Sequence, residues 1–409
     1  MSKQKMMIQT ALMPLYYKNF HCIMGACQDN CCDDGWRIEF DKKDYLKLKH
    51  APKSPELQAM MEKGLFRLRG ERLRDEMYAE FRVTEDGRCC FHREDGLCQL
   101  QLSCGESCLP EVCRWFPRSS RYSPMALEYS LSPACEGVLA LLWDLPQGIE
   151  FLEEPLPEKK RRFYKPDNAM QARFVEIRSL CVDVLQERSL RLPQRFLLLG
   201  FLLQKLGELD WETGAGVDGW LAQGEAALHD ADLAGELGKL PGNRQMFLSQ
   251  NHRVMFSIIM ETTGKKEAIV RQLWSAVTTL EGTGPEKVFI YNLDRYQELE
   301  EKLNGLPGLG EYFFENLMVA VAFYSMFPKL NSPDELWKSY VNLCNIYSLY
   351  RYAAVCGCAE EVSRERLFRS LVSVSREMLH NAVRQNKLRD EFFKNDSATL
   401  AHMAVLVSG

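Results

Sequence analysis

The sequence lacks the features that mark membrane-spanning and secreted proteins. Its longest apolar run, Leu317 to Phe327, is far shorter than the roughly 20 residues that a membrane helix needs. The first residues, Met1 to Phe20, contain no continuous apolar segment and no small-residue cleavage site of a signal peptide. We therefore expect no signal peptide and no membrane span, and we expect a cytoplasmic protein.

An excess of basic residues is also missing. The chain has 51 Lys and Arg against 56 Asp and Glu in 409 residues, which gives a net charge of −5. Proteins dedicated to nucleic acid neutralise phosphates and usually carry a basic excess. This balance argues against nucleic acid as a partner. Hydrophobic residues make up 46% of the chain, which is enough to bury a core and excludes global disorder.

The sequence also lacks a glycine-rich nucleotide-binding motif that follows a strand, which is the only context in which such a motif functions. The letters GxGxxG occur at Gly214, Gly216 and Gly219, but they follow a polar stretch and not a strand. The motif binds a dinucleotide only between a strand and the helix that follows it. We interpret this segment as a loop between helices, so the sequence predicts no familiar site for a nucleotide-like cofactor.

Cysteine, by contrast, is plentiful and unevenly spread. Of 15 cysteines, 11 fall within the first 135 residues. In a reducing cytosol such thiols rarely form disulfides, and a crowd of them more often binds a metal or a cluster. Structural zinc sites usually contain CxxC pairs, and the sequence has none. The scattered thiols therefore favour an iron–sulfur cluster, with zinc as the alternative and plain buried thiols as a less favoured one.

The thiols form two groups along the chain, each with a neighbouring histidine. The first group is Cys22, Cys27, Cys31 and Cys32, and the second is Cys89, Cys90, Cys98, Cys104, Cys108, Cys113 and Cys135. Adjacent side chains diverge, so one of Cys31 and Cys32 is expected to be a ligand and the other a supporting residue. His21 and His92 lie beside cysteines and could bind the metal, although only His21 has a plausible spacing; polar contacts around the site are the favoured role.

Composition divides the chain into three parts. Residues 1–140 are rich in Cys, Arg, Gly and Asp, and residues 141–168 combine prolines with a basic run and are predicted to be a linker. Residues 169–409 show helical periodicity almost throughout. The predicted fold is mainly α: a cysteine-rich metal- or cluster-binding N-terminal region followed by an all-α helical domain.

Local signals predict individual helices. Ser332, Pro333 and Glu335 have the order of a capped helix start, and apolar residues follow from Trp337 to Tyr347 at helical spacing. A long amphipathic helix is predicted over Ser54–Phe81. Similar patterns predict helices over Gln171–Arg188, Gln194–Leu209, Ala268–Leu280, Val288–Leu303, Glu311–Phe327 and Arg364–Arg384.

Several strings in the sequence resemble a known family. They are Phe20-x-Cys22 followed by Ala26-Cys27-x-Asp29-x-Cys31-Cys32 and Gly35-Trp36-Arg37-Ile38, then Gly87-Arg88-Cys89, Asp95-Gly96-Leu97-Cys98, Cys113-Arg114-x-Phe116-Pro117-Arg118 and Ser130-Leu131-Ser132-x-x-Cys135. They resemble the bacterial flagellin lysine-N-methylases, within the wider class of zinc- or iron-chelating CxxCxxCC domains. The likeness returns at Phe314–Leu317 and Met326–Pro328, so it covers most of the chain.

The resemblance implies an enzyme that N-methylates lysine side chains of flagellin with S-adenosylmethionine and carries a [4Fe-4S] cluster. The thiols in the matching strings are its candidate ligands: Cys22, Cys27, Cys31, Cys32, Cys89, Cys98, Cys113 and Cys135. They exceed the four that one cluster needs. Cys90, Cys104 and Cys108 lie outside the strings. The sequence leaves open which four thiols bind, the oligomeric state, and two other functions: a non-catalytic zinc-stabilised interaction protein and a thiol redox sensor.

Methyl transfer to lysine imposes a further requirement. The nitrogen must be neutral, whereas an ordinary lysine has a pKa of about 10.4. A desolvated slot or a nearby base must lower that pKa. Tyr312 and Glu315 suit such a slot and equally suit the edge of a core, so we name no catalytic residue. We expect the slot between the cysteine-rich region and the helical domain, because ligand sites favour domain interfaces.

Overall fold

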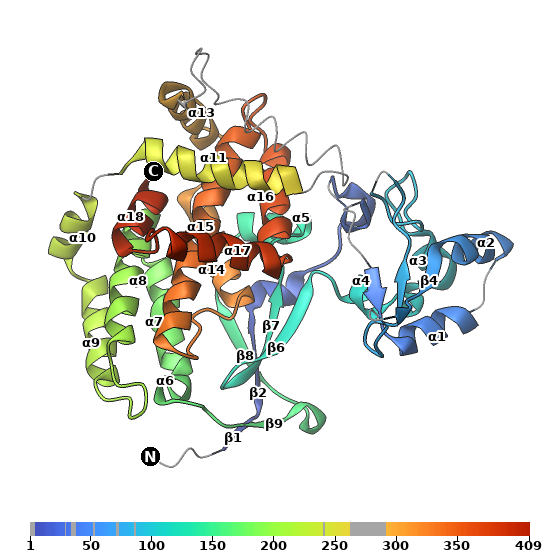
Figure 1. The fold of residues 1–409 in the computed structure, drawn as a ribbon, viewed down its shortest axis with the longest axis horizontal. Helices are drawn as coiled ribbons and strands as arrows, with labels where there is room; N and C mark the ends of the chain where they lie inside the picture. Colours follow the sequence, from blue (N-terminus) through green and yellow to red (C-terminus); the bar gives the residue numbers. More distant parts are fainter. Residues whose placement is uncertain are drawn as a thin grey trace.

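The computed structural model describes residues 5–28, 30–33, 38–51, 54–70, 73–85, 87–239, 242–261 and 292–409. In these residues the protein is mainly helical, as predicted, but its N-terminal region is rich in strands. Figure 1 shows a small lobe, blue to cyan, beside a larger helical body. No helix among the described residues has the length and apolar character required to cross a membrane.

The small lobe, which we call the cysteine-rich lobe, comprises the described residues between 30 and 117. Three short strands form an antiparallel sheet in the order β3-β5-β4. Its elements are β3 (Ile38–Phe40), α1 (Lys42–His50), α2 (Pro55–Gly64), β4 (Leu65–Arg67), β5 (Ala79–Phe81), α3 (Gln99–Cys104) and α4 (Glu111–Trp115). Phe40, Leu57, Phe81 and Phe91 form its small core, on which several cysteines pack.

The prediction of one helix over Ser54–Phe81 is wrong. The predicted start is correct, since Ser54 Oγ accepts a hydrogen bond from the Leu57 amide at 3.2 Å. The helix nevertheless ends at Gly64, and the residues after it form β4, which pairs with β5. The helical spacing of apolar residues therefore runs across a helix and a strand that bury their apolar side chains in one core.

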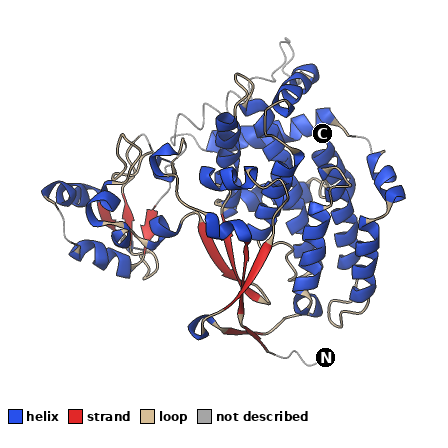
Figure 2. Cartoon of the chain, turned by 180° about the vertical axis from the view of Figure 1, so that it is seen from behind, coloured by secondary structure: helices blue, strands red, loops and turns tan. Residues whose placement is uncertain are grey.

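A second sheet lies in the body and has the order β6-β7-β2-β8. Its strands are β2 (Thr10–Pro14), β6 (Arg118–Tyr122), β7 (Ala126–Leu131) and β8 (Phe151–Pro155). β2 and β7 are parallel, whereas the other pairs are antiparallel. Figure 2 shows these strands as a red fan beneath the helices, separate from the strands of the lobe. The chain thus starts in the body, leaves it to form the cysteine-rich lobe, and returns.

The segment predicted to be a linker takes part in this architecture. Residues 141–168 contain β8 and β9 (Arg162–Tyr164), and β9 pairs with β1 (Met6–Ile8). Leu131 and Val138, which lie within the predicted cysteine-rich region, share one hydrophobic core with the helices of the body. The core therefore joins both ends of the N-terminal region to the helical part.

The body is built around one long central helix, α15 (Pro333–Gly357), which packs against α8, α11, α13, α16 and α18. Ser332 Oγ accepts the Glu335 amide at 3.1 Å, so the predicted start is confirmed. The other helices are α5 (Glu136–Trp143), α6 (Ala169–Ala172), α7 (Phe174–Gln186), α8 (Leu192–Gly207), α9 (Val217–Leu228), α10 (Ala231–Gly238), α11 (Arg244–Glu261), α13 (Leu293–Asn304), α14 (Glu311–Tyr324), α16 (Arg364–Leu379), α17 (Ala382–Lys394) and α18 (Leu400–Ser408).

Three further sequence predictions concern helices or the loops between them. The predicted helix Ala268–Leu280 lies outside the described residues, and the helix expected from Val288 is described from Leu293 as α13. The glycine motif connects α8 to α9, and Gly216, with φ of 90°, caps the start of α9. The prediction of a loop between helices is confirmed for Gly214 and Gly216, whereas Gly219 lies inside α9; the helix α8, and not a strand, precedes the motif.

Candidate functional site

Five of the eight candidate thiols gather in the cysteine-rich lobe. Cys31 and Cys32 lie in a short 3₁₀ helix, and the Cys89 amide donates to the Cys32 carbonyl at 2.7 Å. Cys98 stands at the start of α3, and Cys113 lies on α4. Burial raises the pKa of the Cys98 and Cys113 thiols, and the neighbouring Cys89 and Cys31 raise both further. The thiols are therefore close enough to influence one another's protonation.

The other three candidate thiols lie beside α5. Cys27 Sγ is 3.4 Å from Glu136 Oε2, and the same oxygen accepts the Gln28 amide at 2.8 Å. Burial raises the pKa of Cys135 to about 12, and the nearby Cys31 and Cys22 add to this rise. Cys135 thus lies within electrostatic range of both groups. All eight candidates occur in one region of the protein, at the junction of lobe and body.

A close contact between two loops holds these groups together. A Cβ placed on Gly25 would lie 2.8 Å from the Asp95 carbonyl oxygen, and one on Gly96 would lie 3.1 Å from Gly25 Cα. Asn30 Nδ2 donates to the Gly96 carbonyl at 2.9 Å, and Asn30 Oδ1 accepts the Cys32 amide at the same distance. Glycine is needed at both positions for the backbones to approach.

The remaining polar residues near the thiols have supporting contacts. His92 Nδ1 lies 2.9 Å from Asp33 Oδ1, in agreement with the expected polar role, whereas His21 is exposed. Cys90 Sγ lies 3.7 Å from the Gly64 carbonyl, and Cys104 packs on the core of the lobe. None of the 15 cysteines, all within the described residues, is in a disulfide.

The candidate thiols have the chemical character of ligands for a metal ion or an iron–sulfur cluster. Clustered, partly buried thiols are the donors that zinc and iron–sulfur clusters prefer, and the raised pKa values of Cys98 and Cys113 reflect burial and the neighbouring thiols. Their chemistry fits such a group. In the part of the chain that the structure describes, however, no three His, Cys, Asp or Glu side chains are positioned to hold a metal ion. The ligand set therefore remains a prediction.

Tyr312 and Glu315, which the sequence suggested as lining residues, fasten α14 to its neighbours. Glu315 is buried and pairs with Arg188 at 2.8 Å and with the buried Arg195 at 2.7 Å. Tyr312 Oη donates to the Trp143 carbonyl at 3.2 Å. Their contacts are those of structural residues within the core.

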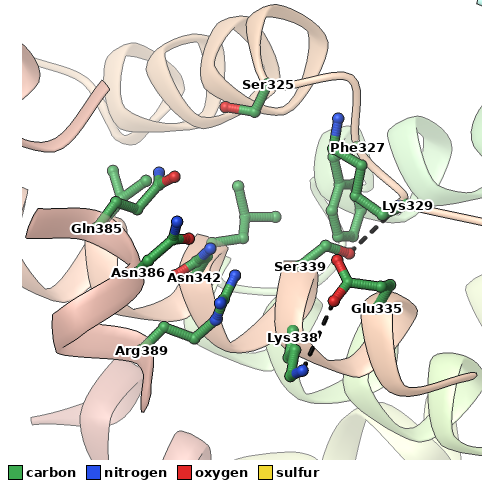
Figure 3. Close-up of a pocket in the computed structure, with 12 residues that line it drawn as sticks. Ser325, Phe327, Lys329, Glu335, Lys338, Ser339, Asn342, Gln385, Asn386 and Arg389 are labelled. Carbon is green, nitrogen blue, oxygen red and sulfur yellow. Dashed lines mark hydrogen bonds and ion pairs between the residues drawn. The ribbon is translucent and has the colours of Figure 1, made fainter. Parts of the chain in front are cut away.

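A pocket that the sequence did not predict opens in the helical body (Figure 3). It has a volume of about 210 Å³ and lies among the loop after α14, helix α15 and helix α17. It is lined by Ser325, Phe327, Lys329, Glu335, Lys338, Ser339, Asn342, Leu343, Ile346, Gln385, Asn386 and Arg389. Met326, with φ of 57°, turns the loop here, and this left-handed conformation leaves no clear signal in a non-glycine sequence.

A second pocket, of about 260 Å³, lies in the cysteine-rich lobe and is strongly acidic. Its lining consists of Glu39, Phe40, Asp41, Asp44, Glu76, Glu111 and Val112. Asp44 is committed to structural contacts, because it pairs with Lys47 at 2.7 Å and accepts the Glu111 amide at 2.6 Å. Three cations and one carboxylate line the first pocket, whereas five carboxylates and no cation line the second.

Comparisons with known proteins find a family that matches the helical part of the chain. The family described as FliB lysine N-methylase C-terminal domain matches residues 178–406, which include the pocket of the helical body. Lysine-N-methylases of Salmonella choleraesuis (strain SC-B67) and Salmonella typhimurium are 28% identical over 151 residues, 36% of this chain and 36% of theirs. The alignment thus spans about a third of the length of these relatives.

A further relative carries a flagellar name. The flagellar biosynthetic protein FliU of Salmonella muenchen is 28% identical over 149 residues, which cover 36% of this chain and 83% of that protein. No solved structure matches the chain. The family match extends over more than half of the chain and ends close to its last residue. The chain therefore belongs to the FliB lysine N-methylase family.

Proposed function

We propose that this protein N-methylates lysine side chains of flagellin, using S-adenosylmethionine as the methyl donor. The observation that carries the proposal is the family match over residues 178–406. The names of the relatives, lysine-N-methylase and flagellar biosynthetic protein, support a protein substrate connected with the flagellum. We infer that the reaction takes place in the cytoplasm, before flagellin is exported.

The reaction is a polar displacement. The lone pair of a neutral lysine nitrogen attacks the methyl carbon of the sulfonium, and the carbon–sulfur bond breaks with its electrons going to sulfur. The products are a thioether and a methylated ammonium, which afterwards loses a proton to solvent. The protein must therefore admit the lysine as a neutral amine, and it must exclude the water that would keep it charged.

We further propose that the thiols at the junction of lobe and body hold a [4Fe-4S] cluster. Cys31, Cys89, Cys98 and Cys113 are the first candidates, because Cys31 and Cys89 both raise the pKa of Cys98 and of Cys113. Such a cluster would supply a soft Lewis acid and folding energy to the lobe. The alternatives are zinc at the same thiols in a non-catalytic interaction protein, and a redox sensor whose free thiols respond to oxidants.

The test uses the full chain purified without oxygen. Incubation with flagellin and S-adenosylmethionine carrying a deuterated methyl group should add that mass to flagellin lysines, as measured by peptide mass spectrometry. Reactions without the donor are the control. Unchanged flagellin in the presence of iron-loaded protein would refute the proposed activity.

Metal analysis tests the cluster separately. Iron and acid-labile sulfide should be present and should be lost in Cys98→Ala and Cys113→Ala proteins. Cys104→Ala and Cys108→Ala serve as matched controls that should retain iron. Stoichiometric zinc without sulfide would favour the alternative.

A further inference from the structure

The pocket of the helical body has one apolar side and one polar side. Phe327, Leu343 and Ile346 are buried and present hydrocarbon to it. The amide groups of Asn342, Gln385 and Asn386 lie together on the opposite side, as Figure 3 shows. At about 210 Å³ the pocket suits one long side chain with an apolar stem and a nitrogen at its end.

One of these amides lacks a partner. Asn342 Oδ1 is buried and accepts no hydrogen bond from any residue that the structure describes. A buried acceptor without a donor costs about 1–3 kcal/mol. A ligand that brings an N–H group to this oxygen would recover that cost, so the pocket is suited to a hydrogen-bond donor.

The charges around the pocket disfavour a cation. Burial lowers the pKa of Lys329, and Arg121 on β6 and Arg178 on α7 lower it further. Glu128 and Glu335 oppose this, but Glu128 is paired with Arg178 at 2.5 Å.

Two further cations line the pocket. They are Lys338, which pairs with Asp334 at 2.5 Å, and Arg389, which is 3.1 Å from Asp390. Glu335 lies 3.6 Å from Lys338 and is therefore also beside a cation. These two cations are paired with carboxylates, so burial and the charge of Lys329 are what favour the neutral form of an amine placed in the pocket.

We propose that this pocket binds the side chain of the lysine to be methylated, with its stem along Phe327 and Leu343 and its neutral amine donating to Asn342 Oδ1. The inference rests on the lysine methylation proposed above and names the acceptor site of that reaction. Asn342 and Lys329 are then positioning residues, since they orient the amine and set its charge. The site lies within the helical body and not between lobe and body, where we had expected it.

The acidic pocket of the lobe is the competing location. Asp41, Glu39 and Glu76 would attract a lysine ammonium more strongly than the amide-lined pocket does. They would also stabilise the protonated form, whose nitrogen has no lone pair to attack a methyl group. The chemistry of methyl transfer therefore selects the pocket that contains Asn342.

A cross-linking experiment tests the location without relying on activity. The probe is a lysine-rich peptide in which one lysine carries a diazirine on its side chain, irradiated with the full-length protein. Mass spectrometry should find adducts within residues 325–346 or 385–389, and free lysine amide in excess should reduce them. Adducts confined to residues 39–44 and 111–112, or absent from the first two ranges, would overturn the proposal.

Substitutions test the role of the pocket in the reaction. Asn342→Asp keeps the shape but adds a carboxylate that stabilises the ammonium of the bound lysine, so the acid limb of the kcat pH profile, which reports the enzyme–substrate complex, should move up by about one pH unit. Lys329→Met removes a repelling charge and should move it in the same direction, whereas Lys329→Arg should restore it. Lys239→Met, at an exposed and distant ion pair, is the control.

The outcomes separate the two proposals. Unmoved pH profiles in folded Asn342→Asp and Lys329→Met proteins would overturn the acceptor pocket while leaving the methylase activity intact. Cross-linking at the pocket in a protein that methylates no flagellin lysine would support lysine binding there and refute the proposed reaction.

Discussion

At the scale of single residues, a few buried charged side chains connect the helices of the body to one another. Glu315 receives hydrogen bonds from Arg188 and Arg195, and Arg195 also donates to the Leu185 and Leu190 carbonyls. A buried charge is tolerated only when such partners surround it. Removing one charged side chain leaves its partner buried without a counter-charge. The resulting loss of stability is larger than the net stabilisation that the ion pair itself contributes.

We expect Glu315→Gln to lower the free energy of unfolding by about 3 kcal/mol, because Arg195 would remain buried without a counter-charge. Urea denaturation measures the difference. Glu298→Gln is the matched control: Glu298 is exposed and pairs with Arg295 and Lys302, so its loss should have a much smaller effect on the free energy of unfolding. Equal effects of the two substitutions would contradict the structural role assigned to Glu315.

A second residue-scale prediction concerns pH. A hydrogen bond from the Ser189 amide, at 2.9 Å, lowers the pKa of Glu187 despite its partial burial. Because the folded pKa lies below the unfolded one, this carboxylate stabilises the protein at neutral pH, and the contribution is lost as pH falls through the folded pKa. Glu187→Gln should therefore cost about a few tenths of a kcal/mol at pH 7 and less than that at pH 3. Thermal unfolding at both values measures this, and a difference that grows towards pH 3 would contradict it.

At the scale of elements, the turn after α2 depends on the absence of a side chain. A Cβ on Gly64 would lie 2.3 Å from Cys90 Sγ. The end of α2 therefore packs directly against the segment that carries Cys90, and no room is left for a side chain at Gly64. Helix and strand meet at this residue. The close packing fixes how the thiol-bearing turn lies against α2 and β5.

Gly64→Ala should destabilise the cysteine-rich lobe by about 1–3 kcal/mol, because the added methyl group displaces Cys90. Gly219→Ala is its control, since nothing lies within 4 Å of the position and alanine favours the interior of α9. Hydrogen exchange of the lobe amides reports the first change. Unaltered exchange in the Gly64→Ala protein would show that the space is not needed.

The elements also show what the sequence could and could not predict. The start of α15 follows from Ser332 and Pro333, because capping and helical periodicity are local signals. The strands are three to six residues long, and β2 pairs with β7 across the whole cysteine-rich lobe, so neither strand has a local signal strong enough to identify it. The helix predicted through Phe81 failed for the same reason.

The candidate site was predictable in part. The cysteine spacing indicated one thiol-rich region, and the eight candidate thiols do lie in one region. The pocket beside Asn342 was not predictable, because the α14–α15 loop, α15 and α17 come together only in the folded protein. Lys329 differs from other lysines only through its burial near Arg121 and Arg178, which no local pattern shows.

At the scale of the whole molecule, the cysteine-rich lobe is an excursion from the body and has its own small core. If a metal or cluster occupies its thiols, chelation should expose residues 30–117 to proteolysis while the body remains intact, because ligation supplies much of the folding energy of such segments. Limited digestion followed by mass spectrometry measures the cleavage sites. Equally frequent cleavage in residues 118–239 would contradict the prediction.

The parallel pairing of β2 with β7 has a kinetic consequence. Thr10 aligns with Ala126, so the central pair of the body sheet closes a loop that contains the entire lobe. The entropy lost on closing a flexible loop increases with its length, by about 0.6 kcal/mol for each doubling. A lobe that has already folded shortens the flexible part and brings the two strands together sooner. If an ion or cluster completes the lobe, its supply would then control how quickly the distant helical body assembles.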